Sequence, residues 1–315
     1  MSLAFATKST LLNNSPLERA ILETLAYSDV FDYPLTIHEL HRFLTISATL
    51  KEVRECVIDM KQVSSAHGYY FLTGRSEIVD IRKQREHNSS KAYRRAIFYG
   101  RILGRLPFIR MVALTGSLAM LNLSKNSDMD YMLVAKPSRV WTARAFTLLL
   151  ARVTHLLGDV ICPNVIISEN ALDWKERNLY SAREFAQMII IRGEDVFCVL
   201  RVANNWIEDF LPNHVIVSEA KDLHAGNAIQ LFLEFLLNSK FGNLFEFWEM
   251  NRKIARLQKQ AGYGIETNFS EDVCQGNFDH HGLWTLQAYE ERLKNLLPNG
   301  EGRRRTVPVE AVREK

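Results

Sequence analysis

The sequence has few cysteines, no long uninterrupted apolar run and only a small net charge, and each of these features excludes a class of protein. Four cysteines among 315 residues lie far apart, and none forms a C-x-x-C pair or has a histidine at zinc-ligand spacing. We therefore expect reduced thiols, as in a cytoplasmic protein, and no zinc site. The formal charge of +3 is too small to indicate a nucleic-acid-binding protein by itself.

No segment has the pattern of a targeting or membrane-spanning sequence. The first residues, MSLAFATKST, have no apolar core behind a basic start, so we expect no signal peptide. The most apolar run, residues 146–157, is interrupted by Arg152 and His155 and is too short to cross a bilayer. We expect a soluble, cytoplasmic protein with no membrane partner, and its apolar content of 47% is enough for a substantial core.

Three capping-box signals predict three short helices near the N-terminus. In each, a hydroxyl residue is followed three positions later by a glutamate, so that both side chains can bind backbone N–H groups of the first turn. The pairs are Ser15 and Glu18, Thr36 and Glu39, and Thr49 and Glu52. A polar turn and the β-prone run 69–72 follow. Three helices and a small hairpin in this span predict a winged helix-turn-helix domain over residues 15–76.

The third of these helices, expected over residues 49–62, is the one that would contact DNA in such a domain. Its three basic residues are balanced by three acidic ones, so the attraction to phosphates that supplies most non-specific affinity is nearly absent. Two interpretations stay open. The domain either binds DNA with the help of neighbouring segments, or it has a protein-contacting or architectural role.

Residues 77–106 are predicted to form a long basic connecting helix. Between residues 77 and 104, seven arginines and lysines stand against three acidic residues. These cations either steer a triphosphate or a nucleic acid towards an active cleft, or lie on a solvated helix that separates two domains.

The stretch TGSLAMLNLSKNSDMDYMLVA, residues 115–135, carries the strongest functional signal. A β-like run, residues 109–114, ends at Gly116 and Ser117, and a small-residue turn of this kind presents backbone N–H groups and a hydroxyl to phosphate oxygens. Asp128 and Asp130 are two positions apart on the next strand, so both project from the same face. Neighbouring carboxylates repel unless a cation lies between them, and Mg²⁺ prefers such oxygen ligands. The stretch therefore predicts a site for a triphosphate and two Mg²⁺ ions.

Gly-Ser, ten further residues and then Asp-x-Asp between apolar positions resembles the signature of the polymerase β-like nucleotidyltransferase superfamily. The strand, helix and strand expected over residues 130–135, 140–157 and 159–168 are similar in order to those of the family. The resemblance implies that Gly116 and Ser117 bind an NTP such as ATP, and that Asp128 and Asp130 are the catalytic residues and the ligands of two Mg²⁺ ions. The order of the three regions of the chain is also similar to that of a group of bacterial proteins.

In the superfamily a third carboxylate often activates the acceptor hydroxyl, and the resemblance places it on the strand DVICPNVIIS, residues 159–168. Asn164 is an inward-facing candidate there, and an amide cannot act as a general base near neutral pH. Asp159 and Glu169 lie at the two ends of the strand and are the acidic alternatives. The identity of the third residue stays open between these three.

The sequence as a whole predicts an α+β protein of three parts. The winged helix is followed by a nucleotidyltransferase domain with a mixed sheet over residues 107–200, in which Ser181 and Glu184 predict a further capping box. A helical C-terminal domain is expected over residues 201–298, and residues 299–315 are expected to form a flexible tail. Asp279, His280 and His281 are expected in a loop before a helix rather than in a metal site.

The expected activity is Mg²⁺-dependent transfer of a nucleoside monophosphate from an NTP to an acceptor hydroxyl, with release of pyrophosphate. The acceptor is RNA, a protein or a small molecule. The alternative is a regulator or interaction protein in which an inactive nucleotidyltransferase domain senses a nucleotide, while the winged helix contacts DNA or a partner.

Overall fold

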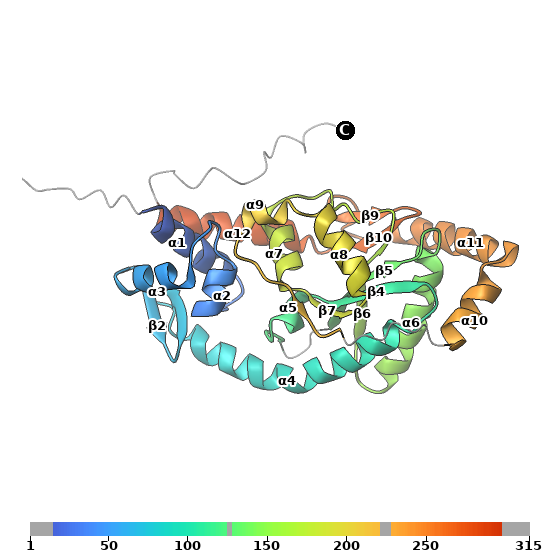
Figure 1. Cartoon of the computed structure of the whole chain (residues 1–315), viewed down its shortest axis with the longest axis horizontal. Helices are drawn as coiled ribbons and strands as arrows, with labels where there is room; N and C mark the ends of the chain where they lie inside the picture. Colours follow the sequence, from blue (N-terminus) through green and yellow to red (C-terminus); the bar gives the residue numbers. More distant parts are fainter. Residues whose placement is uncertain (1–14, 125–127, 221–227, 298–315) are drawn as a thin grey trace, which may run out of the picture.

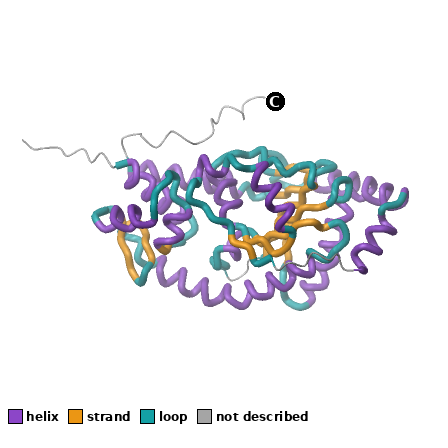
Figure 2. The backbone as a smooth tube through the Cα atoms, in the orientation of Figure 1, coloured by secondary structure: helices purple, strands orange, loops and turns teal. Residues whose placement is uncertain are grey.

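The computed structural model describes residues 15–124, 128–220 and 228–297 (Figure 1). The tail expected over residues 299–315 lies outside these ranges. The described chain is a mixed α+β structure, and its strands gather into a three-stranded sheet and a seven-stranded sheet (Figure 2). Over the same ranges, no helix is long and apolar enough to span a membrane.

The N-terminal unit contains three helices and the smaller sheet. Its elements are α1 (Pro16–Asp29), β1 (Leu35–Thr36), α2 (Ile37–Arg42), α3 (Leu50–Ile58), β2 (Val63–Ala66) and β3 (Tyr69–Leu72). The strands are antiparallel in the order β1-β3-β2. All three capping boxes form, with the hydroxyl accepting from the third backbone N–H and the glutamate accepting from the cap's own N–H. The predicted helices and hairpin are therefore confirmed.

The helix α4 (Ile78–Leu103) runs from the smaller sheet along one side of the larger sheet (Figure 1), as predicted for residues 77–106. Its cations hold parts of the molecule together. Arg82 is 4% exposed and forms ion pairs with Glu39 (2.7 Å) and Glu86 (2.7 Å). Arg95 forms an ion pair with Asp159 (2.9 Å). These two arginines connect elements rather than steer a phosphate.

The larger sheet has the strand order β8-β7-β4-β5-β6-β10-β9. The bounds of these strands are β8 (Val217–Ser218), β7 (Ile189–Arg192), β4 (Ile109–Leu114), β5 (Met129–Ala135), β6 (Ile161–Ser168), β10 (Val273–Gly276) and β9 (Thr267–Phe269). β4 is antiparallel to β5, whereas β5 and β6 are parallel and are joined by α6 (Val140–Leu156). The parallel pair requires this helical crossover, which agrees with the predicted strand-helix-strand order.

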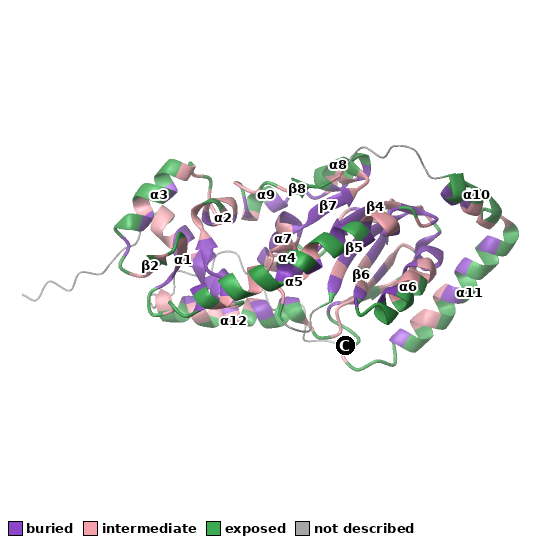
Figure 3. Cartoon of the chain, turned by 90° about the horizontal axis from the view of Figure 1, so that it is seen from below, coloured by how far each residue is buried: buried purple, intermediate pink, exposed green. Residues whose placement is uncertain are grey.

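Side chains of β5 alternate between two apolar clusters, because successive residues of a strand point to opposite faces. Tyr131 and Leu133 pack with residues of α4 and α6 on one face. Figure 3 shows these two helices and the buried strands beside them. Met132 and Val134 pack on the other face with α7 (Leu179–Gln187) and α8 (Glu194–Ala203). By the same alternation, Asp130 lies on the α7 face.

The prediction of a helical C-terminal domain over residues 201–298 needs correction. This region does contain α9 (Ile207–Phe210), α10 (Ala228–Leu237), α11 (Lys240–Leu257) and α12 (His281–Leu296). It also supplies β8, β9 and β10, which extend both edges of the larger sheet. These strands have two to four residues. β8 and β10 pair with strands far away in the sequence, and β9 joins the sheet through its neighbour β10. A local pattern could not reveal them.

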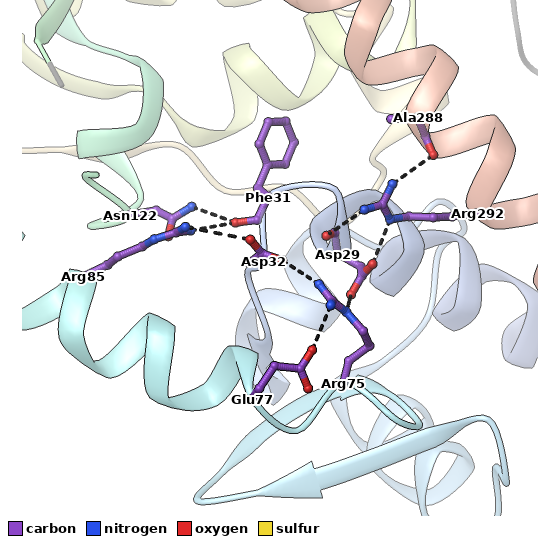
Figure 4. Close-up of polar contacts among 9 residues, drawn as sticks. All are labelled: Asp29, Phe31, Asp32, Arg75, Glu77, Arg85, Asn122, Ala288 and Arg292. Carbon is purple, nitrogen blue, oxygen red and sulfur yellow. Dashed lines mark hydrogen bonds and ion pairs between the residues drawn. The ribbon is translucent and has the colours of Figure 1, made fainter. Parts of the chain in front are cut away.

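α12 returns to the N-terminal unit, where a polar network joins four parts of the chain (Figure 4). Asp29, at the end of α1, is buried and binds Arg75 (2.8 Å) after β3 and Arg292 (2.7 Å) of α12. Close to it, Arg85 of α4 donates to the backbone oxygen of Phe31 (2.8 Å) and to Asn122 (3.1 Å). The N-terminal unit is thereby fixed to α4, to α12 and to the segment after α5.

Replacing Asp29 by alanine should lower the free energy of unfolding by about 2–3 kcal/mol, because two arginines lose a buried partner but stay partly solvated. Chemical denaturation of both proteins measures this change. Asp173→Ala is the matched control, since Asp173 also binds two cations, Lys175 (2.6 Å) and Arg177 (2.9 Å), but on the surface. Equal stability losses in the two variants would contradict a connecting role for Asp29.

Candidate active site

Two of the predicted residues, Gly116 and Asp130, lie side by side at adjoining ends of β4 and β5. Gly116 and Ser117 begin the short helix α5 (Gly116–Ala119), directly after β4. Because β4 and β5 are antiparallel, the end of β4 meets the start of β5, and the backbone N–H of Thr115 donates to the backbone oxygen of Asp130 (2.9 Å). The turn and the Asp-x-Asp pattern are thus brought together, as the sequence predicted.

Gly116 is in contact with the carboxylate of Asp130. Its φ of +65° is in the left-handed region, which favours glycine. A Cβ atom at this position would collide with Oδ2 of Asp130. Both the backbone conformation and the close approach therefore require a residue without a side chain.

Gly116→Ala is expected to lower the free energy of unfolding by about 1–2 kcal/mol more than Gly68→Ala does, since it adds a steric collision to the strain of a positive φ. Gly68 is the matched control, because its φ is +83° and no atom lies within 4 Å of the position its Cβ would take. Thermal or urea unfolding of the two variants measures the difference. Equal losses of stability in the two variants would show that the Asp130 carboxylate is not in steric contact with Gly116.

Asp130 is in an environment that resists its ionisation. The side chain is half-buried, and this burial raises its pKa, as does the nearby charge of Asp128. A hydrogen bond from the Cys162 thiol lowers the pKa, and the net value is about 7. Asp128 is exposed just before β5 and falls on the same face by strand alternation. Met129 and Tyr131 point to the opposite, buried face. The predicted pair of same-facing carboxylates is therefore consistent with the structure.

Neither acidic candidate for the third position presents its carboxylate to Asp130. Asp159 is buried, forms its ion pair with Arg95 and accepts a hydrogen bond from Tyr99 (2.8 Å) of α4, on the other face of the sheet. Glu169 follows Ser168, which pairs with Ala135 at the far end of β5. That end is about 17 Å along the strand from Asp130.

The strand beside Asp130 offers a thiol and an amide in place of a carboxylate. Cys162 stands opposite Asp130 in the register of β5 and β6. Asn164 lies where the register of β5 and β6 shifts. Its side chain is exposed to the cavity described below, which agrees with the predicted inward orientation. No group of three or more His, Cys, Asp or Glu side chains suited to a metal ion occurs in the described part of the chain.

An acidic residue from another element, Glu184 of α7, faces this site, although the sequence pattern predicted a different role for it. Burial raises the pKa of Glu184, as does the charge of Asp130, while the Gln187 amide donates a hydrogen bond to the carboxylate (2.5 Å) and lowers it, giving a value of about 7. Its predicted place in a capping box with Ser181 is wrong. The N-cap is Asn178, whose side chain accepts from the backbone N–H of Ser181 (2.8 Å). Asn178, a favoured N-cap residue three positions earlier, was the signal available in the sequence.

A cavity of about 350 Å³ joins these residues to the N-terminal unit. One side of its lining comes from the larger sheet and α5, namely Gly116, Ser117, Asp130 and Asn164. α7 contributes Tyr180, Arg183 and Glu184, and α12 contributes His281 and Thr285. The N-terminal unit closes the cavity with the aromatic residues Tyr27, Phe31, Tyr33 and Phe43. A second cavity, of about 100 Å³, shares Asn164, Tyr180, Glu184 and His281 with the first.

The donor set at Asp128 and Asp130 suits Mg²⁺. This ion is bound through one or two carboxylates together with substrate phosphates and water, so two aspartates suffice on the protein side. The mutual repulsion that raises the pKa of Asp130 is the interaction that a cation relieves. Asp279 and His280 precede α12, in agreement with the expected loop before a helix, whereas His281 is the first residue of that helix and lies 3.9 Å from Asp279.

Comparison with protein-family models, with curated proteins and with solved structures finds no match to this chain. The geometry of the site itself therefore carries the assignment of function.

Proposed function

We propose that the protein is a Mg²⁺-dependent nucleotidyltransferase, which moves a nucleoside monophosphate from an NTP to an acceptor hydroxyl and releases pyrophosphate. The observation that supports this most strongly is the contact between the Gly116 turn and the Asp130 carboxylate, beside a cavity large enough for a small ligand. The order of β4, the turn, β5, α6 and β6 is similar to that of the polymerase β-like superfamily. We further propose that the N-terminal unit is a winged helix that closes the cavity.

The residues of the turn and of β5 have separate roles in this proposal. The backbone N–H groups at Gly116 and the Ser117 hydroxyl bind the β- and γ-phosphates. Asp128 and Asp130 would hold Mg²⁺, which would supply positive charge to offset that of the phosphates and of the leaving pyrophosphate. The protein's contribution is mainly positional and electrostatic, because little covalent chemistry is required of its side chains.

Glu184 takes the proton of the acceptor hydroxyl. The acceptor oxygen then forms a bond to the α-phosphorus, while the bond from that phosphorus to the bridging oxygen breaks and pyrophosphate leaves with the electron pair. A pKa near 7 suits a base that works at neutral pH. Glu184 reaches the cavity from α7, and it supplies the carboxylate that β6 lacks.

A second function is favoured by one observation, the thiol and the amide at Cys162 and Asn164. A site without a β6 carboxylate can bind a nucleotide and leave it intact, as in a nucleotide-sensing regulator. The DNA-binding form of this alternative has less support. α3 is exposed, its charges are balanced, and Lys51 and Glu55 lie 3.8 Å apart on it.

The two functions are separated by incubating the protein with Mg²⁺ and each α-labelled NTP, using RNA, protein and small-molecule fractions as acceptors. Transfer of label to any fraction supports the enzyme. Retention of an unchanged NTP on the protein, with no labelled product, supports the sensor. If the protein neither binds nor transfers any NTP, both functions are overturned.

A further inference from the structure

A buried arginine with an unsatisfied donor lines the same cavity. Arg183 of α7 is 4% exposed, and its guanidinium lies over the rings of Tyr27 (4.5 Å) and Phe43 (4.3 Å). Its Nη2 donates long hydrogen bonds to Thr24 (3.2 Å) and Ser28 (3.4 Å), whereas its buried Nε has no hydrogen-bond partner. No carboxylate among the described residues forms an ion pair with it.

The surroundings of Arg183 leave its charge uncompensated. Burial lowers the pKa of Arg183 to about 10, so the group is still protonated at neutral pH. Arg42 stacks on the same Phe43 ring at 5.1 Å and also has a buried Nε without a partner. Glu39 acts on both arginines from a distance but is bound directly by Arg82. Burial of an unpaired cation lowers the stability of the folded protein unless an anion forms an ion pair with it.

The rest of the cavity indicates the kind of molecule that would bring this anion. Tyr27, Phe31, Tyr33 and Phe43 offer ring surfaces that suit a planar, apolar body. A volume of about 350 Å³ is within the range of small-molecule sites, which are usually apolar with a few precisely placed polar groups. A folded macromolecule does not fit in such a space.

We propose that Arg183 binds the anionic group, a carboxylate or a phosphate, of a small planar acceptor whose hydroxyl is presented to Glu184. The transfer to that hydroxyl rests on the proposed function. Anion binding by Arg183 does not, because it requires neither Mg²⁺ nor an NTP. Of the three acceptor classes, the cavity thus favours the small molecule over RNA and protein.

The test measures thermal stabilisation of the protein by three probes, without Mg²⁺ or NTP. Benzoate and phenyl phosphate carry the two kinds of anion on a planar ring, and benzyl alcohol is the neutral counterpart. We expect at least one anion to stabilise the wild type more than benzyl alcohol does, and Arg183→Met to bind that anion about tenfold more weakly or worse. Arg201→Met, which removes an exposed arginine of α8, is the control and should leave binding unchanged.

Equal stabilisation of wild type and Arg183→Met, or no preference for either anion over benzyl alcohol, would overturn the proposal. Arg183→Lys provides a second variant if the methionine variant does not fold. It keeps the charge but loses the planar fork, and intermediate binding is expected. The proposal would also be overturned if the wild type binds neither anion but transfers label from an NTP to RNA or to protein. Anion binding through Arg183 without any nucleotidyl transfer would instead refute only the proposed function.

Discussion

Asp130→Asn is expected to lower kcat/KM for nucleotidyl transfer by about a thousandfold or more, because the variant loses a charge that acts on the metal and the transferred phosphate. The measurement is the initial rate of label transfer from an α-labelled NTP. Asp159→Asn is the matched control, since Asp159 is an acidic residue of the same region that binds Arg95 and Tyr99 away from the site. The control should lose stability but keep turnover.

The same Asp130 variant should be more stable than the wild type when Mg²⁺ is absent and the pH is high. The pKa of Asp130 is about 7 in the folded protein, against 3.8 for an ordinary aspartate, so the folded state holds its proton more tightly than the unfolded chain does. The carboxylate therefore reduces stability increasingly as the pH rises from about 4 to about 7, and its full cost is present above that range. Asparagine removes this cost, so the melting temperature should rise at pH 8 and change little at pH 4. Retained turnover, or lower stability at pH 8, would contradict the assignment of Asp130.

Glu184→Gln is expected to slow nucleotidyl transfer by about 10²–10⁴-fold while leaving Mg²⁺-NTP binding nearly unchanged, because an amide cannot accept the acceptor's proton. The rate of the wild type should rise with pH as the carboxyl loses its proton, at or below about pH 7 because Mg²⁺ offsets the Asp130 charge that raises the pKa of Glu184, and then level off. At saturating Mg²⁺ the aspartates are held ionised, so this rise reports on Glu184.

The pH dependence distinguishes a base from a merely structural residue. The variant should lose the rise with pH as well as the rate, whereas Glu194→Gln, an exposed glutamate of α8, should keep both. A Glu184→Gln enzyme that is slow but keeps the same rise would show that Glu184 is not the base.

Short-range signals in the sequence predicted the parts of the fold that depend on neighbouring residues. The capping boxes at Ser15, Thr36 and Thr49 form because each glutamate is one turn from its hydroxyl. The alternation of Met129 to Tyr131 fixed the face on which Asp130 lies, since a strand has a period of two.

The residues that were misassigned depend on contacts between distant segments. Asp159 is bound by Arg95, which is far from it in the sequence, and β10 joins the larger sheet through pairs such as Cys274 with Ile166 of β6. No local pattern specifies such partners.

The role that we propose for the N-terminal unit rests on long-range packing. Its sequence left a DNA-binding role and a protein-contacting or architectural role open, and in the structure the Tyr33 hydroxyl donates to the backbone oxygen of Met120 (2.9 Å), just after α5. Phe31 and Tyr33 consequently line the cavity that contains Gly116 and Asp130. A unit that closes a small-molecule site accounts for the balanced charge of α3 better than a DNA-binding unit does.

The central claim is that Gly116, Asp128 and Asp130 together bind an NTP through Mg²⁺. Calorimetric titration with a non-hydrolysable NTP tests it most directly, using the wild type and Asp130→Asn, each with Mg²⁺ and with EDTA in its place. We predict binding by the wild type in Mg²⁺, loss of that binding in EDTA, and at least about tenfold weaker binding by the variant. Equal binding with and without Mg²⁺, equal binding by the two proteins, or no binding of any NTP would contradict the account.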